Sequence, residues 1–158
     1  MNYEKASNLL IMCSSFDRFQ TFLKIKDELN DKDYWRTLAD AYTGSDNLYH
    51  LNEEVKESFL EDRSQREYLM TKQELKIYNS LPEIITIYRG MTTEELESGD
   101  FGVSWTLSKE CAEFFAFKYG RNFSTEGKPK VVHQLEVLKV EILAYFHERN
   151  EQEVIYIQ

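Results

Sequence analysis

Glu151-Gln152-Glu153-Val154-Ile155-Tyr156-Ile157-Gln158 is the stretch that decides how the second half of this sequence is interpreted. The run from Val154 to Ile157 is apolar at every position, which is typical of a strand covered on both faces. Alternate side chains of a strand share a face, so we expect the Glu151 and Glu153 carboxylates to lie together at the mouth of a buried strand. Glu-x-Glu also arises by chance in a chain with 28 acidic residues among 158. A functional interpretation of the two glutamates therefore depends on the residues that precede them.

The composition is that of one globular domain with a full core. The chain has 42% hydrophobic and 14% aromatic residues, and its 6 Gly and 2 Pro leave little room for a linker. We expect a single domain over residues 1–158, with a helical part over 1–80 and a β-rich part over 81–158.

Charge and cysteine usage narrow the classes of partner. Lys and Arg total 19 against 28 Asp and Glu, a net charge of −9, which disfavours binding nucleic acid mainly through phosphates and favours a protein partner. Cys13 and Cys111 belong to no Cys/His cluster, so we expect no metal site and a reducing compartment, either the cytoplasm or the cytoplasm of a host or target cell into which the protein is delivered. The apolar run from Leu9 to Cys13 is too short for a signal sequence or a membrane span, so we expect no membrane partner.

The first half has the periodicity of helices. Apolar residues recur near every 3.6 positions from Phe16 to Leu60, with polar breaks at residues 30–33 and 44–47. Ser64-x-x-Glu67 and Thr71-x-x-Glu74 resemble capping boxes, so further helices are expected before Pro82. We find no catalytic arrangement in this half.

After Pro82 the sequence becomes rich in strand-forming residues. Strands are expected over 84–88, 101–106, 131–140 and 142–145, with a short helical turn after Thr92 and a helix that begins at Ser108. Helices followed by a sheet indicate an α+β fold.

Two motifs in this half could contact a ligand. Arg89-Gly90, at the end of the expected strand over 84–88, is suited to phosphate, because a guanidinium has forked donors and glycine permits close approach. An ordinary surface arginine before a turn explains it as well. Ser104-Trp105-Thr106 places two hydroxyls on one strand face and an indole on the other. Trp105 either packs in the core or stacks on a ligand ring.

Taken in this order, the three motifs resemble those of the mono-ADP-ribosyltransferases of the Arg-Ser-Glu class. The match runs through Tyr88-Arg89-Gly90, Ser104-Trp105-Thr106 and Glu151-Gln152-Glu153, and it covers about the last half of the chain. The family usually has Ser-Thr-Ser as its middle motif, so Ser104 fits, whereas Trp105 and Thr106 depart from the pattern. The resemblance implies N-terminal helices packed on a mixed β-sheet of the ADP-ribosyltransferase type.

The resemblance also implies NAD as substrate, no metal, and a role for each motif residue. Glu153 would bond the ribose 2′-hydroxyl, Ser104 would orient Glu153, and Arg89 would hold the NAD phosphates. Glu151 would accept the proton of the acceptor, which in this family is usually arginine when the motif is Glu-x-Glu. The expected NAD-binding set is Arg89, Gly90, Ser104, Trp105, Thr106, Arg121 and Glu153. The expected target-recognition turn is Tyr145, Phe146 and His147.

Three functions stay open at this point. The first is transfer of ADP-ribose to a protein, as a toxin, effector, phage or defence enzyme; a toxin would need a neutralising partner protein. The second is the same chemistry on a nucleic-acid base. The third is a catalytically inactive interaction or adaptor domain.

Overall fold

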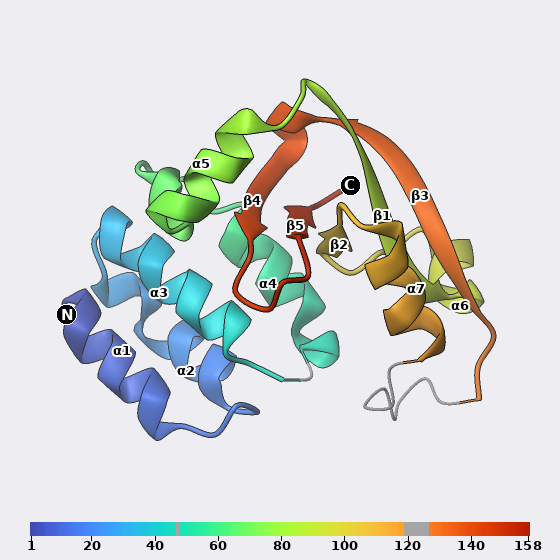
Figure 1. Ribbon diagram of the computed structural model, residues 1–158. Coiled ribbons are helices and arrows are strands. Elements are labelled where there is room, and N and C mark those ends of the chain that lie inside the picture. Colours follow the sequence, from blue (N-terminus) through green and yellow to red (C-terminus); the bar gives the residue numbers. More distant parts are fainter. Residues whose placement is uncertain (47, 119–126) are drawn as a thin grey trace. The chain divides into compact units, whose positions relative to one another are not determined.

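In the computed structural model, which describes residues 1–46, 48–118 and 127–158, the chain divides into two compact units, Met1–Leu75 and Lys76–Gln158. The boundary lies inside helix α5 (Lys72–Ser80), slightly before the boundary at residue 80 that the change in sequence character predicts. Helices make up the first unit, and all the described strands belong to the second (Figure 1). The α+β class is therefore confirmed.

The first unit is built from short helices, two of which begin at an asparagine whose side chain caps the helix. Asn30 ends the preceding segment and starts the next helix, because its side chain accepts a hydrogen bond from the Asp33 amide at 2.9 Å. The polar break expected over 30–33 is thus a helix start. The α-helices and 3-10 helices of this unit are α1 (Tyr3–Met12), α2 (Arg18–Ile25), η1 (Lys26–Glu28), α3 (Asp31–Thr43), η2 (Tyr49–Leu51), α4 (Asn52–Phe59) and η3 (Arg66–Leu69).

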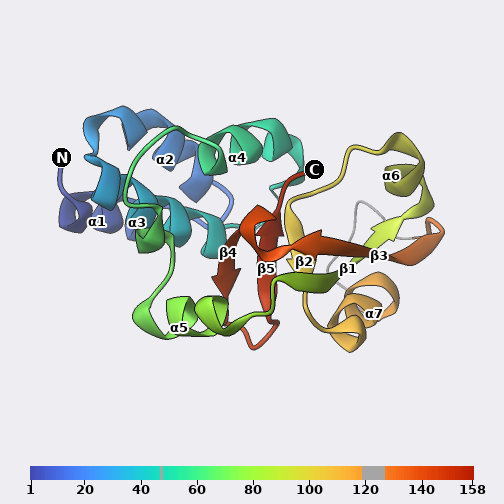
Figure 2. The same ribbon diagram turned by 90° about the horizontal axis from the view of Figure 1, so that it is seen from above.

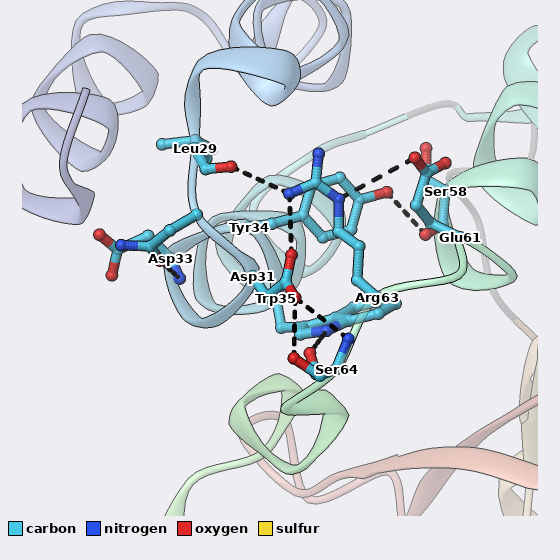
Figure 3. A network of polar contacts seen from close by, with 10 residues as sticks. Leu29, Asp31, Asp33, Tyr34, Trp35, Ser58, Glu61, Arg63 and Ser64 are labelled. Atoms are coloured by element: carbon cyan, nitrogen blue, oxygen red, sulfur yellow. Dashed lines mark hydrogen bonds and ion pairs between the residues drawn. The ribbon is translucent and has the colours of Figure 1, made fainter.

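The core of the first unit is aromatic and is closed by a polar network around α3. Tyr34 and Trp35 are fully buried with ring centroids 4.9 Å apart. The Trp35 indole donates to the Ser64 carbonyl at 2.7 Å, and the Tyr34 hydroxyl donates to the Ser58 carbonyl at 2.8 Å (Figure 3). Ser64 also donates its hydroxyl to Asp31, at 2.8 Å. The network therefore fastens the segment after α4 onto α3, and the capping box expected at Ser64 does not form.

The second unit is organised by a sheet whose order over the described residues is β3-β1-β2-β5-β4. Every pairing among these strands is antiparallel, so the expectation of a mixed sheet is wrong in this respect. The strands are β1 (Ile84–Thr92), β2 (Ser104–Thr106), β3 (Lys130–Leu138), β4 (Ile142–Phe146) and β5 (Glu153–Tyr156), with η5 (Lys139–Glu141) between β3 and β4.

Two helices accompany this sheet. Helix α6 (Thr93–Ser98) follows β1 directly and is capped by Thr92, as the sequence predicts. Helix α7 (Lys109–Phe117) is capped by Ser108, whose hydroxyl accepts from the Cys111 amide at 3.2 Å. Figure 2 shows α6 and α7 on opposite sides of the ribbon formed by β1 and β3. Over the described residues, no helix has the length and apolar character needed to cross a membrane.

Candidate functional site

Ser104 and Glu153 meet across the neighbouring strands β2 and β5. The register pairs Thr106 with Glu153 and Ser104 with Ile155, so the side chains of Ser104 and Glu153 lie diagonally on one face. The Ser104 hydroxyl donates to Glu153 Oε2 at 2.5 Å, although the two residues are 49 positions apart in sequence. This short, charge-assisted bond fixes the position of the Glu153 carboxylate.

Arg89 joins the same group through the backbone of Ser104. Its Nη1 donates to the Ser104 carbonyl at 2.9 Å, so the three motif residues form one hydrogen-bonded chain that runs across β1, β2 and β5. Arg89 lies in the middle of β1, where it pairs with His133, rather than at the end of a strand. The expected strand over 84–88 was therefore too short.

The Arg89 guanidinium also holds a residue that the sequence analysis missed. The Glu95 carboxylate on α6 accepts two hydrogen bonds from this guanidinium, from Nε to Oε2 at 2.7 Å and from Nη2 to Oε1 at 3.0 Å. Both side chains are largely buried, with 21% and 17% exposed. The Thr92-x-x-Glu95 cap, which places Glu95 beside Arg89, was the sequence signal that could have indicated the pair. A bidentate ion pair is suited to fixing the direction of Arg89.

Strand alternation separates the motif side chains between the two faces of the sheet. Arg89 alternates with Tyr88 and Gly90 along β1, and the single β1–β2 pair joins Tyr88 to Thr106. One face therefore carries Tyr88, Gly90, Ser104, Thr106 and Glu153, and the opposite face carries Arg89, Trp105 and His133. The Arg89 guanidinium reaches the backbone carbonyl of Ser104 because Gly102 has no side chain. A Cβ added at Gly102 would lie 2.4 Å from Arg89 Nη2.

Gly90 is required by the close packing of β1 against α7. A Cβ at Gly90 would lie 2.5 Å from the Ala112 carbonyl oxygen and 2.9 Å from the Ala116 Cβ. Helix α7 therefore covers the side of β1 that we expected to face phosphate. Packing against α7 thus accounts for Gly90 without a ligand, and its NAD-binding role stays a prediction.

Glu151 lies in the turn before β5, not in the strand. Gln152 has a φ of 47°, in the left-handed region, so the alternation expected over 151–153 does not hold. Burial raises the pKa of the Cys111 thiol, a hydrogen bond with Thr106 opposes that rise, and the negative charges of Glu151 and Glu153 add to it. Burial raises the pKa of Glu151, and the positive charge of Arg149 opposes that rise.

Thr106 is buried and contacts the turn that carries Glu151. Its side chain is buried, with 7% exposed, and its hydroxyl donates to the Glu151 carbonyl at 2.7 Å. The same oxygen accepts from the Ser108 amide at 3.0 Å. The hydroxyl thus links the turn to the start of α7.

Trp105 belongs to the core of the second unit. It is 2% exposed and packs against an aromatic group with ring centroids 5.9 to 6.1 Å from its own: Phe101, His133 and Tyr156. Its indole nitrogen has no hydrogen-bond partner among the described residues. Of the two alternatives for Trp105, this packing favours a position in the core over stacking on a ligand ring.

The expected target-recognition turn is only partly at the surface. Tyr145 and Phe146 are 2% and 4% exposed, since both lie in β4, so neither fits a direct contact with a target. His147 is half-buried, and its Nδ1 lies 2.6 Å from the Tyr145 hydroxyl. Arg121, expected as a phosphate contact, lies outside the described residues. The described residues contain no group of three or more His, Cys, Asp or Glu arranged to hold a metal.

Comparisons of the chain with protein-family models, with curated proteins and with solved structures found no significant match. A function must therefore be argued from the residues and their geometry.

Proposed function

We propose that this protein is a mono-ADP-ribosyltransferase that moves ADP-ribose from NAD to a macromolecular acceptor, with protein arginine as the favoured acceptor. One observation carries the proposal: Arg89, Ser104 and Glu153, which carry the motif resemblance, form a single hydrogen-bonded chain across β1, β2 and β5. Ser104 and Glu153 meet through their side chains, whereas Arg89 reaches the backbone carbonyl of Ser104 from the opposite face of the sheet.

The strand order supports the finer proposal of an ADP-ribosyltransferase type of sheet. The motif strands β1, β2 and β5 are consecutive neighbours, although β5 follows β2 by nearly 50 residues in the chain. Such an order brings a carboxylate from the C-terminal strand beside the middle motif. The hydroxyl–carboxylate pair then has a defined geometry.

Glu153 would stabilise the transition state. When the bond between the nicotinamide nitrogen and ribose C1′ breaks, the electron pair leaves with nicotinamide and positive charge develops on the sugar. A carboxylate fixed in advance lowers that barrier, because its orientation is established by folding and not during the reaction. The bond from Ser104 at 2.5 Å supplies this fixation.

Glu151 would accept the proton of the acceptor. In transfer to arginine, a guanidinium nitrogen forms a bond to C1′ and loses a proton. Burial raises the pKa of Glu151, which makes its carboxylate a better proton acceptor than an ordinary surface glutamate. Transfer should therefore fall as acid protonates Glu151.

Arg89 would interact with the NAD phosphates only if Glu95 shares or yields the guanidinium. Two of its donors bond Glu95 and a third bonds the Ser104 carbonyl. A pyrophosphate that approaches Arg89 therefore competes with a bidentate carboxylate. His147 is the member of the expected recognition turn whose exposure suits a target contact.

The direct test is incubation of the protein with labelled NAD and a cell lysate, with Glu153→Gln as the inactive variant. We expect release of nicotinamide and label on macromolecules, with both reduced by about 100-fold or more in the variant. Protease and nuclease digestion of the product separate a protein acceptor from a nucleic-acid acceptor. If the intact protein neither releases nicotinamide nor transfers label, the proposal fails.

A second function, an inactive interaction domain, is favoured by one observation, the pairing of Arg89 with Glu95. A guanidinium held in this way suits a structural role as well as a phosphate contact. Thermal unfolding with and without NAD distinguishes the two, because a ligand that binds the folded state raises the melting temperature. An inactive domain that does not bind NAD gives no shift.

A further inference from the structure

The two hydroxyls of the Ser104-Trp105-Thr106 motif make different contacts. The Ser104 hydroxyl bonds the side chain of Glu153, whereas the Thr106 hydroxyl bonds the backbone carbonyl of Glu151. Both hydroxyls lie on one face of β2 and each serves one of the two glutamates. The motif therefore contacts both carboxylate-bearing residues through separate hydrogen bonds.

The turn that carries Glu151 is hydrogen-bonded both within itself, from the Asn150 amide to the His147 carbonyl at 3.0 Å, and to β2 and the residue after it. Asn150 and Gln152 have φ values of 58° and 47°, a left-handed conformation that is disfavoured for residues other than glycine and persists where surrounding contacts hold it. The contacts recorded from β2 and its following residue are the Thr106 hydroxyl to the Glu151 carbonyl, at 2.7 Å, and the Leu107 amide to the Gln152 carbonyl, at 3.1 Å.

Thr106 connects this turn to a rigid element. Its oxygen accepts from the Ser108 amide, and Ser108 is the N-cap of α7. Because Thr106 is buried and bonded on both sides, its hydroxyl has one orientation. The position of Glu151 is thus set by the start of α7, independently of the bond that sets Glu153.

We propose that Thr106 is a positioning residue that places Glu151 for the proton-accepting step, while Ser104 places Glu153 for cleavage of NAD. This inference rests on the proposed function for its chemical meaning. Its structural part, that the Thr106 hydroxyl holds the turn over 150–152, stands apart from any activity. Transfer to an acceptor and hydrolysis of NAD should accordingly respond differently to changes at Thr106.

The test compares Thr106→Val, which removes the hydroxyl at nearly constant shape, with Thr106→Ser, which keeps it. Thr86→Val is the matched control, because Thr86 is half-buried on β1, where it pairs with Glu136. The measurements are NAD hydrolysis, transfer to the small guanidinium compound agmatine, and hydrogen exchange of the Leu107 amide. We expect Thr106→Val to lower the kcat of transfer about tenfold more than that of hydrolysis, because misplacement of a reacting group reduces the rate steeply.

Hydrogen exchange provides the measurement that needs no activity. In Thr106→Val, loss of one typical hydrogen bond should speed exchange of the Leu107 amide about fivefold, with Thr106→Ser and Thr86→Val close to the parent. Equal losses of transfer and hydrolysis, failure of Thr106→Ser to restore transfer, or unchanged exchange in Thr106→Val would each overturn the inference. If the parent protein has no activity but exchange responds as expected, Thr106 still positions the turn, and the proposed function alone is refuted.

Discussion

Replacing Gly90 with alanine distinguishes packing from ligand approach at the first motif. The added Cβ would lie 2.5 Å from the Ala112 carbonyl oxygen. Carbon and carbonyl oxygen normally approach to about 3.3 Å, so β1 and α7 would have to separate locally by about 0.8 Å. The atoms that the new Cβ would meet are backbone atoms of Ala112 and Ala116 and the Ala116 Cβ, so no side-chain rotation relieves the contact.

The size of the effect follows from this overlap. Overpacking of a well-filled site destabilises by about 1–3 kcal/mol, and we expect a value of about 2–3 kcal/mol because a helix backbone must move. For a protein of this size, that corresponds to a melting temperature lower by about 4–12 °C. Without the overlap the sign would reverse, because alanine is more stable than glycine in a strand by about 0.5–1 kcal/mol.

The assay is thermal unfolding followed by circular dichroism, with Gly102→Ala measured beside Gly90→Ala. A Cβ at residue 102 would meet the Arg89 guanidinium, at 2.4 Å from Nη2, and this side-chain end can swing away. We therefore expect the smaller loss of stability in Gly102→Ala, together with a weakened pair between Arg89 and Glu95. A Gly90→Ala protein as stable as the parent, or more stable, would refute the packing role and restore the ligand-approach explanation.

Three other predictions concern the carboxylates and the first unit. Ser104→Ala should lower NAD hydrolysis about 10- to 100-fold, the range for losing a hydrogen bond to a charged group, and an unchanged kcat would exclude a role in fixing Glu153. Glu151→Gln should raise the melting temperature at pH 7 and not at pH 4: the folded-state pKa of Glu151 is raised by burial, so its contribution to stability is present in acid and is lost as the pH rises through that pKa. Equal shifts at both pH values would contradict this sign. Trp35→Phe should destabilise the first unit by about 1–3 kcal/mol in urea unfolding, because it leaves the Ser64 carbonyl without its donor, and an unchanged midpoint would show that water replaces the bond.

Local signals in the sequence identified several features that the structure confirms. Ser108 and Thr92 cap helices because a hydroxyl that precedes a helix accepts an amide from its first turn. Thr71 and Glu74 form the expected reciprocal box, in which the Thr71 amide donates to Glu74 and the Glu74 amide donates to Thr71. The same pattern at Ser64 failed because Asp31, distant in sequence, takes the Ser64 hydroxyl.

Where the sequence alone was wrong, left two alternatives open or gave no prediction, a long-range contact decided the outcome. The strand over 84–88 extends to Thr92 because β3 pairs with it through Lys130. Trp105 suited a ligand stack as well as a core position until its aromatic neighbours were known. The pairing of Arg89 with Glu95 required the direction of α6 relative to β1.

By itself, the sequence determined the α+β class, the helix caps at Thr71, Thr92 and Ser108, and the set of motif residues that includes Ser104 and Glu153. These depend on hydrogen bonds and apolar patterns within a few residues of one another, which a sequence displays directly. Only the tertiary structure decided that Ser104 bonds Glu153, that Arg89 is held by Glu95, and that Gly90 packs against α7. The physical reason is that strand register and the direction of a helix arise from contacts between distant segments, which no local pattern specifies.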